Sequence, residues 1–183
     1  VAYQTAWLKA HYPAAFMAAV LSSDMDNTDK VVMLIEETRR MNIEIVPPSV
    51  NASFYSFTVK DEKTIQYGLG AIKGVGAAAI DNIIQEREEK GSYGNLFDLC
   101  KRIDLRKANK RVLDALIKSG AMDSLGAGRN TLVENLDKAT SLAEQHNKNL
   151  DSGQNDMFGL DTTVKSDSED DGASVYDVVK DWD

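Results

Sequence analysis

The residues best placed to hold a ligand form a glycine turn, Ile72-Lys73-Gly74-Val75-Gly76, directly before a stretch with helical spacing. Glycines let a backbone turn tightly and approach a ligand closely, and the free N–H groups at a helix start favour an anion. Lys73 would add a charge-assisted hydrogen bond. The turn therefore indicates phosphate binding, although a tight connection between two helices explains the same glycines.

A second candidate turn lies downstream, where a helical stretch ends at Gly120 and Gly126 and Gly128 precede the next one. A basic patch lies between the two turns, with two acidic residues in it, Asp104 and Asp114. Its seven basic residues are Lys101, Arg102, Arg106, Lys107, Lys110, Arg111 and Lys118. A solvated helix face would have the same composition.

A glycine turn followed by a helix resembles the helix-hairpin-helix motif, whose turn amides hold DNA phosphates without reading base sequence. On this interpretation Lys73, Gly74, Val75 and Gly76 contact duplex DNA, and the seven residues of the basic patch add contacts to the DNA backbone. The net charge of -8 does not oppose it, because the acidic excess is local. Eight acidic and two basic residues lie between Asp161 and Asp183.

A short apolar group, Gln154-Asn155-Asp156-Met157-Phe158, interrupts the polar stretch that begins at Lys148. A Met-Phe pair on an extended peptide can fill pockets of a hydrophobic groove while the Gln amide hydrogen-bonds at its rim. The group resembles the internal peptide by which bacterial replicases bind their sliding clamp. On that reading Gln154, Asp156, Met157 and Phe158 contact the clamp. The alternative is that the group docks onto its own domain.

No pattern typical of catalysis or metal binding is visible. A nucleophilic triad, a phosphate-binding Walker loop and a pair of metal-holding carboxylates are all missing. The single cysteine, Cys100, excludes an internal disulfide framework and is expected to be buried, and the widely separated His11 and His146 make a zinc site improbable. No apolar run approaches the roughly 20 residues of a membrane span, and the sequence opens at Val1 without a Met or a signal-peptide pattern. We therefore expect a cytoplasmic segment of a longer chain.

Periodicity predicts a mainly α-helical chain. Pro13 suits the first position of a helix, and Asp26 suits the N-cap of the next, whose apolar stripe ends at Thr38. Residues 56–60 and 64–67 alternate as a β-hairpin turning at 61–63, the only sheet expected. Further helices are expected at 77–89, 95–102, 108–119 and 129–147.

The aromatic residues near the start of the chain have two possible roles. Tyr3, Trp7, Tyr12 and Phe16 follow helix-like spacing. Aromatic rings can stack on unpaired bases, but this spacing favours packing in a core.

Four segments together resemble one protein family. Residues 3–13 and 25–31 are similar to the fingers region of the C-family replicative DNA polymerases, as found in the alpha subunit of bacterial DNA polymerase III. Residues 67–76 are similar to the helix-hairpin-helix entry of that family, and residues 154–158 to its clamp peptide. The resemblance runs almost continuously from Val1 to Leu160.

The resemblance implies three parts: the end of the fingers with a small hairpin at 1–66, a tandem helix-hairpin-helix domain at 67–147, and a disordered, acidic linker with the clamp peptide at 148–183. It implies part of a DNA-directed DNA polymerase, a nucleotidyltransferase of chromosome replication, whose magnesium is held by palm aspartates that this chain lacks. The segment should therefore be inactive alone and hold no cofactor.

The partners implied by the resemblance are primer-template duplex, the sliding clamp and other replicase subunits, with no membrane. Two other readings stay open from the residues. One is a non-catalytic helix-hairpin-helix module of a DNA repair protein, and the other is a protein-binding helical domain whose turns touch no DNA.

Overall fold

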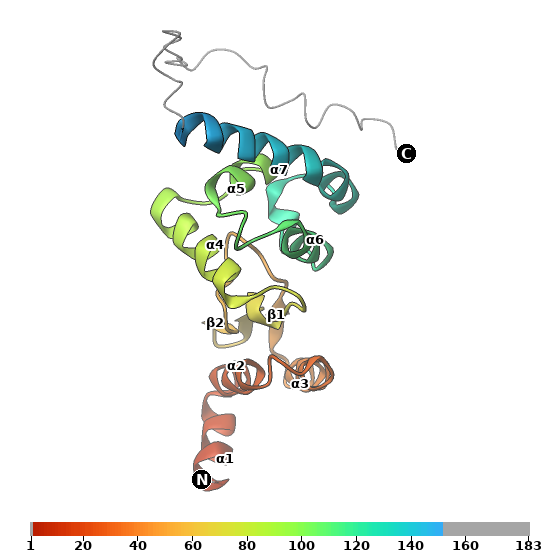
Figure 1. Cartoon of the computed structure of the whole chain (residues 1–183). Coiled ribbons are helices and arrows are strands. Elements are labelled where there is room, and N and C mark those ends of the chain that lie inside the picture. Colours follow the sequence, from red (N-terminus) through yellow and green to blue (C-terminus); the bar gives the residue numbers. More distant parts are fainter. Residues whose placement is uncertain (1, 152–183) are drawn as a thin grey trace.

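The computed structural model describes residues 2–151, which form helices stacked around a small sheet (Figure 1). The helices are α1 (Ala2–His11), α2 (Pro13–Ser23), α3 (Thr28–Arg40), α4 (Ala77–Lys90), α5 (Leu96–Arg102), α6 (Lys110–Lys118) and α7 (Arg129–Asp151). Two 3-10 turns, η1 (Leu69–Ala71) and η2 (Asp123–Leu125), and three strands, β1 (Glu44–Val46), β2 (Thr58–Asp61) and β3 (Thr64–Gln66), complete the described part. The predicted mainly α-helical fold is confirmed.

The lower part of the molecule packs α2 and α3 against the sheet. Its core includes Met17 and Leu21 of α2, Val31 of α3 and Ile65 of β3. Pro13 occupies the first turn of α2, as predicted. The predicted N-cap of α3 was one residue early, because the side chain of Asn27, and not that of Asp26, accepts the hydrogen bond from the Lys30 amide at 3.1 Å.

The predicted hairpin is present, but the sheet has a third strand. β2 and β3 pair antiparallel, and β1 pairs parallel to β3 with Ile45 opposite Ile65, giving the order β1-β3-β2. β1 has three residues and stands directly before Pro47-Pro48. A strand of that length is too short to show a clear alternation of apolar and polar residues.

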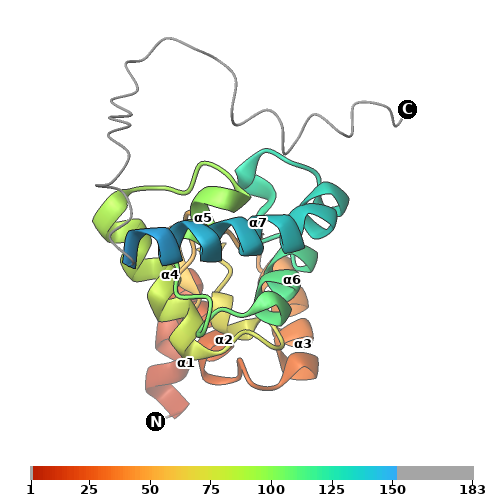
Figure 2. The same ribbon diagram turned by 45° about the horizontal axis from the view of Figure 1, so that its top comes forward.

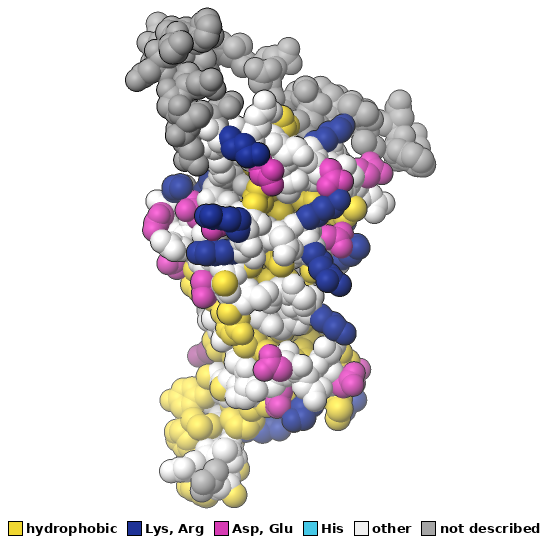
Figure 3. Space-filling view, viewed as in Figure 1, with side chains coloured by type: hydrophobic (Ala, Val, Ile, Leu, Met, Phe, Trp, Pro, Cys, Tyr) yellow, Lys and Arg dark blue, Asp and Glu magenta, His cyan; other side chains and the backbone are white. Residues whose placement is uncertain are grey.

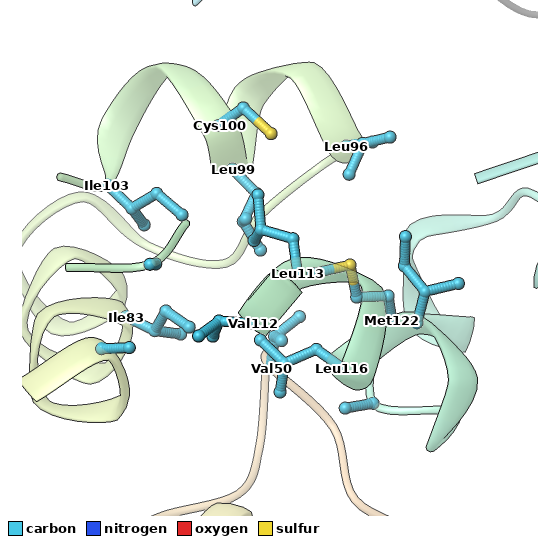
Figure 4. Packing of buried hydrophobic residues seen from close by; sticks show 14 of the residues in the cluster. Val50, Ile83, Leu96, Leu99, Cys100, Ile103, Val112, Leu113, Leu116 and Met122 are labelled. Atoms are coloured by element: carbon cyan, nitrogen blue, oxygen red, sulfur yellow. The ribbon is translucent and has the colours of Figure 1, made fainter. Parts of the chain in front are cut away.

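The upper part of the molecule packs α4 to α7 around a second core. α7 lies across α5 and α6, which both views show (Figures 1 and 2). The centre of this core includes Ile83, Leu99, Leu113 and Leu116 (Figure 4). Cys100 is buried there, as predicted. The four helices predicted for this part are confirmed, with ends that differ by up to four residues.

The prediction that the first aromatic residues pack in a core is wrong for three of them. Helix α1 has no buried residue, and Tyr3, Trp7 and Tyr12 are 81%, 43% and 59% exposed. The Trp7 ring instead packs against His11 and Tyr12, with ring centroids 4.5 and 5.9 Å apart. Phe16, on α2, does pack against the lower core. Figure 3 shows hydrophobic side chains gathered at the lower end of the molecule, around α1.

The two cores meet near Tyr67, whose ring packs against both. Val50 belongs to the upper core although it precedes the hairpin. The boundaries predicted at 66 and 147 stay a prediction, and the linker prediction from residue 152 onward lies outside the described residues. Within residues 2–151, no helix combines the length and the apolar composition that a membrane crossing requires.

Candidate nucleic-acid interface

The first glycine turn faces solvent. Gly74 has a φ of +89°, which only glycine adopts without strain, and it is exposed together with Lys73 and Gly76. A Cβ atom built on Gly74 or Gly76 would meet no atom within 4 Å. Val75, in contrast, is 8% exposed and anchors the turn in the upper core. The backbone of the turn is thus both fixed and open to a ligand.

The start of α4 adds hydrogen-bond donors to this turn. Gly76 is the N-cap and has no side chain to accept a bond from the helix. The Ala79 and Ile80 amides bond to the Gly76 carbonyl, at 3.1 and 3.2 Å. The amides of Ala77 and Ala78 have no helical carbonyl one turn earlier to bond to, as at every helix start, and both residues are exposed. These N–H groups and the positive end of the helix dipole suit a phosphate.

The element before the turn is the short 3-10 helix η1. η1 has only three residues, so it cannot hold the turn by a long helix of its own. Its amides are bonded to a loop distant in sequence: Leu69 donates to the Phe54 carbonyl at 2.8 Å, and Gly70 donates to the Tyr55 carbonyl at 2.9 Å. The position of the turn therefore depends on this loop.

The second turn, between α6 and α7, makes more side-chain contacts within the protein than the first turn does. Gly120 and Gly126 have φ values of +83° and +84°. Arg129 donates two hydrogen bonds to the Asp123 carboxylate, Nε to Oδ1 at 2.8 Å and Nη2 to Oδ2 at 2.6 Å, which lowers the pKa of Asp123. The Arg129 guanidinium lies over Gly120, where an added Cβ would clash with it.

The basic patch divides into paired and unpaired side chains. Three exposed residues, Lys101, Lys107 and Arg111, have no ion pair recorded within residues 2–151. Four residues are paired: Arg102 with Asp98, Arg106 with Asp104, Lys110 with Asp137 and Lys118 with Asp114, at 3.3, 3.1, 2.5 and 2.7 Å. Figure 3 shows Lys and Arg side chains along both sides of the upper half, with Asp and Glu among them.

Arg102, in contrast, is held by contacts within the fold. Its side chain is 11% exposed. Its Nη2 donates to the carbonyls of Glu86 and Gly91 at 2.5 and 2.8 Å, and its guanidinium stacks on the Tyr93 ring at 4.3 Å. A sequence pattern cannot distinguish this buried arginine from its exposed neighbours.

Arg87 is a structural residue that the sequence analysis missed. It is 9% exposed and donates from Nη1 to the Val50 and Ser53 carbonyls, at 3.1 and 2.8 Å. The available signal was its position, because Arg87 continues the buried face of α4 that contains Ile80 and Ile83. A charged residue on an apolar helix face needs internal partners.

The remaining points concern possible metal ligands and the predicted clamp peptide. Among the residues that the structure describes, no three His, Cys, Asp or Glu side chains converge as a metal ion would require. The predicted clamp contacts, Gln154, Asp156, Met157 and Phe158, lie outside the described residues.

Comparisons with known proteins agree with this geometry. The helix-hairpin-helix motif family matches residues 42–132. Proteins named DNA polymerase III subunit alpha are 47% identical over 182 residues in Vibrio cholerae, 54% over 160 residues in Escherichia coli and 50% over 169 residues in Pasteurella multocida. These alignments cover 100%, 87% and 92% of this chain and 14 to 15% of the relatives. The chain therefore belongs to the DNA polymerase III alpha-subunit family, and it spans about one seventh of the length of these relatives.

Proposed function

We propose that this chain is the part of a replicative DNA polymerase that holds the backbone of duplex DNA. The observation that carries the proposal is the exposed turn from Lys73 to Gly76, in a chain that is about half identical to DNA polymerase III alpha subunits. The turn offers backbone N–H groups at the start of α4 together with the Lys73 ammonium group. One DNA phosphate fits this set of donors.

The unpaired cations of the patch supply the remaining contacts. Lys101, Lys107 and Arg111 would bind phosphates by charge, and the paired residues Arg106, Lys110 and Lys118 would bind them after exchanging their carboxylate partners. Contacts of this type release counterions and carry no sequence information. The chain would therefore hold any duplex that passes the polymerase.

The polymerase reaction itself belongs to the complete subunit in this proposal. Nucleotidyl transfer with magnesium and a primer-template would take place outside this segment, which should be inactive alone. The magnesium of this reaction would be held by palm aspartates that lie outside this segment. Other replicase subunits and a cytoplasmic location are part of the same proposal.

Duplex binding can be tested with two fluorescent duplexes of equal length and unrelated sequence. The proposal predicts the same affinity for both, within about twofold, since phosphate contacts are independent of sequence. A strong preference for one duplex would contradict the proposed backbone contacts. Absence of binding at low salt would contradict DNA binding altogether.

We further propose that Gln154, Asp156, Met157 and Phe158 bind the sliding clamp. The support is the residue pattern and the alignment with the Vibrio cholerae subunit, which covers the whole chain. Even a weak peptide contact would keep the polymerase near a ring that encircles the DNA, because tethering raises effective concentration.

A titration with purified bacterial clamp tests the tether. The Met157→Ala, Phe158→Ala double variant should lose binding, because it removes the side chains that fill the groove. A Thr162→Ala, Val164→Ala double variant, which changes neighbouring residues, should bind as the unmodified chain does. Equal binding by all three proteins would place the clamp contact elsewhere.

The repair-module alternative has less support. It would share the glycine turns, but it explains neither the clamp-like peptide nor the similarity of residues before the turn to replicative polymerase subunits. Clamp binding that depends on Phe158 would decide between the two.

A further inference from the structure

One loop, from Ser49 to Tyr55, contacts η1, which leads into the first glycine turn, and also contacts the second turn. On the side of the first turn, the carbonyls of Phe54 and Tyr55 accept the η1 amides described above. On the side of the second turn, the Val50 amide donates to the Ala121 carbonyl at 2.8 Å, one residue after Gly120. The Ser49 and Ser124 hydroxyl oxygens lie 3.3 Å apart, which adds a second link.

The contact with η1 leaves no free space. A Cβ atom on Gly68 would lie 2.6 Å from the Ser56 carbonyl carbon, and one on Gly70 would lie 2.9 Å from the Tyr55 carbonyl oxygen. Backbone therefore packs directly on backbone, and any shift of the loop moves η1 with it. Because Gly70 precedes Gly74 by only four residues, the first turn would follow.

Arg87 holds the loop from the other side. It lies on α4, the helix that starts at the first turn, and its guanidinium bonds to the Val50 and Ser53 carbonyls and lies 5.0 Å from the centre of the Phe54 ring. Hydrogen bonds from a charged donor are stronger than neutral ones, and the buried carbonyls would lose these partners without it.

The loop is also anchored in the upper core. Val50 is fully buried, and Figure 4 shows it beside Val112 and Leu116, with Leu116 on the helix that leads into the second turn. Ser53 is equally buried, and its hydroxyl accepts a hydrogen bond from the Gln66 side chain at 3.0 Å.

We propose that the Ser49–Tyr55 loop is a strut that sets the distance between the two turns, and that Arg87 is the positioning residue that holds it. This inference rests on the proposed DNA-binding function. Phosphates of a duplex have fixed spacing, so two turns bind it together only when their own spacing matches. A fixed spacing raises the effective concentration of the second contact once the first has formed.

The distance between the turns can be measured directly with spin labels at Lys73→Cys and Lys118→Cys. Burial raises the pKa of the Cys100 thiol to about 12, which keeps this cysteine out of the labelling reaction at neutral pH. The unmodified loop should give one narrow distance distribution. Arg87→Met should broaden it, because the strut loses its link to α4.

Arg102→Met is the matched control, since Arg102 is also a nearly buried arginine that bonds backbone carbonyls but does not touch the strut. It should leave the distribution narrow even if it lowers stability. If Arg87→Met does not fold, Asn51→Ala replaces it, because the Asn51 side chain joins the strut to Tyr93 by two hydrogen bonds of 2.7 and 3.0 Å. That variant should also broaden the distribution.

Duplex binding completes the test. In unlabelled proteins, Arg87→Met should lower duplex affinity by about tenfold, since the two turns no longer bind jointly. A narrow distribution in folded Arg87→Met, or a broadened one with unchanged affinity, would overturn the strut. If the unmodified chain binds no duplex at all, the DNA-binding function itself fails, whereas the distance distributions still decide whether Arg87 fixes the spacing.

Discussion

Lys73 stands beside the exposed turn with no recorded ion pair within residues 2–151, so its charge is available to a phosphate. Lys73→Ala should weaken duplex binding and reduce the slope of log affinity against log salt by about one, as expected for one phosphate contact. Lys60→Ala is the control, because Lys60 is an exposed lysine on β2, outside the turn and the patch. Equal losses in both variants would show a general charge effect and not a contact at the turn.

Cys100 makes stability depend on pH in the alkaline range. Its folded-state pKa is raised by burial from 9.0 to about 12. Between these values the unfolded chain releases the thiol proton and the folded chain keeps it, so the free energy of unfolding falls as pH rises. Denaturant unfolding from pH 8 to 11 should show a steeper fall for the unmodified chain than for Cys100→Ala. Parallel curves would mean that the thiol ionises equally in both states.

Single side chains also mark the limit of what the sequence predicts. The burial of Cys100 and the exposure of Lys73 and Gly74 agree with their sequence context. The internal role of Arg102 does not follow from its neighbours, because it arises from carbonyls 11 and 16 residues away. Contacts that distant leave no local pattern.

Among the elements, α3 provides a sharp stability prediction. The Asn27 side chain caps the helix, so Asn27→Ala should lower the free energy of unfolding by about 1 kcal/mol. Asp26→Ala removes the neighbouring polar residue without removing that bond and should have a much smaller effect. Chemical denaturation of both variants measures the difference, and a larger loss for Asp26→Ala would contradict the observed cap.

Long helices could be predicted because each presents a repeating apolar face to a core, as α4 does with Ile80 and Ile83. Short elements could not. β1 exists because its backbone pairs with β3, about 20 residues later, and η1 exists because the strut accepts its amides. For helix α1 the sequence predicts too much burial. Its aromatic spacing suggests a buried face, but no described part of the chain covers it.

The whole molecule has two cores that meet near Tyr67, and one loop links the elements of its two glycine turns. The sheet and α2 and α3 form the lower core, and α4 to α7 form the upper core that supports both glycine turns. The overall fold class and the first turn followed from the sequence, whereas the strut did not, because its contacts join residues from Ser49 to Ser124. Such long-range bonds depend on the completed packing.

Salt dependence of duplex binding tests the central claim most directly. With Lys73, Lys101, Lys107 and Arg111 each on a phosphate, log affinity should fall against log salt with a slope of about −3 to −4, and the slope should reach about −6 when Arg106, Lys110 and Lys118 also exchange their carboxylates for phosphates. The measurement requires only the unmodified chain, a labelled duplex and a series of salt concentrations. That slope would support a surface that holds the DNA backbone. A binding constant that does not change with salt, or no binding at low salt, would contradict it and favour a protein-binding helical domain.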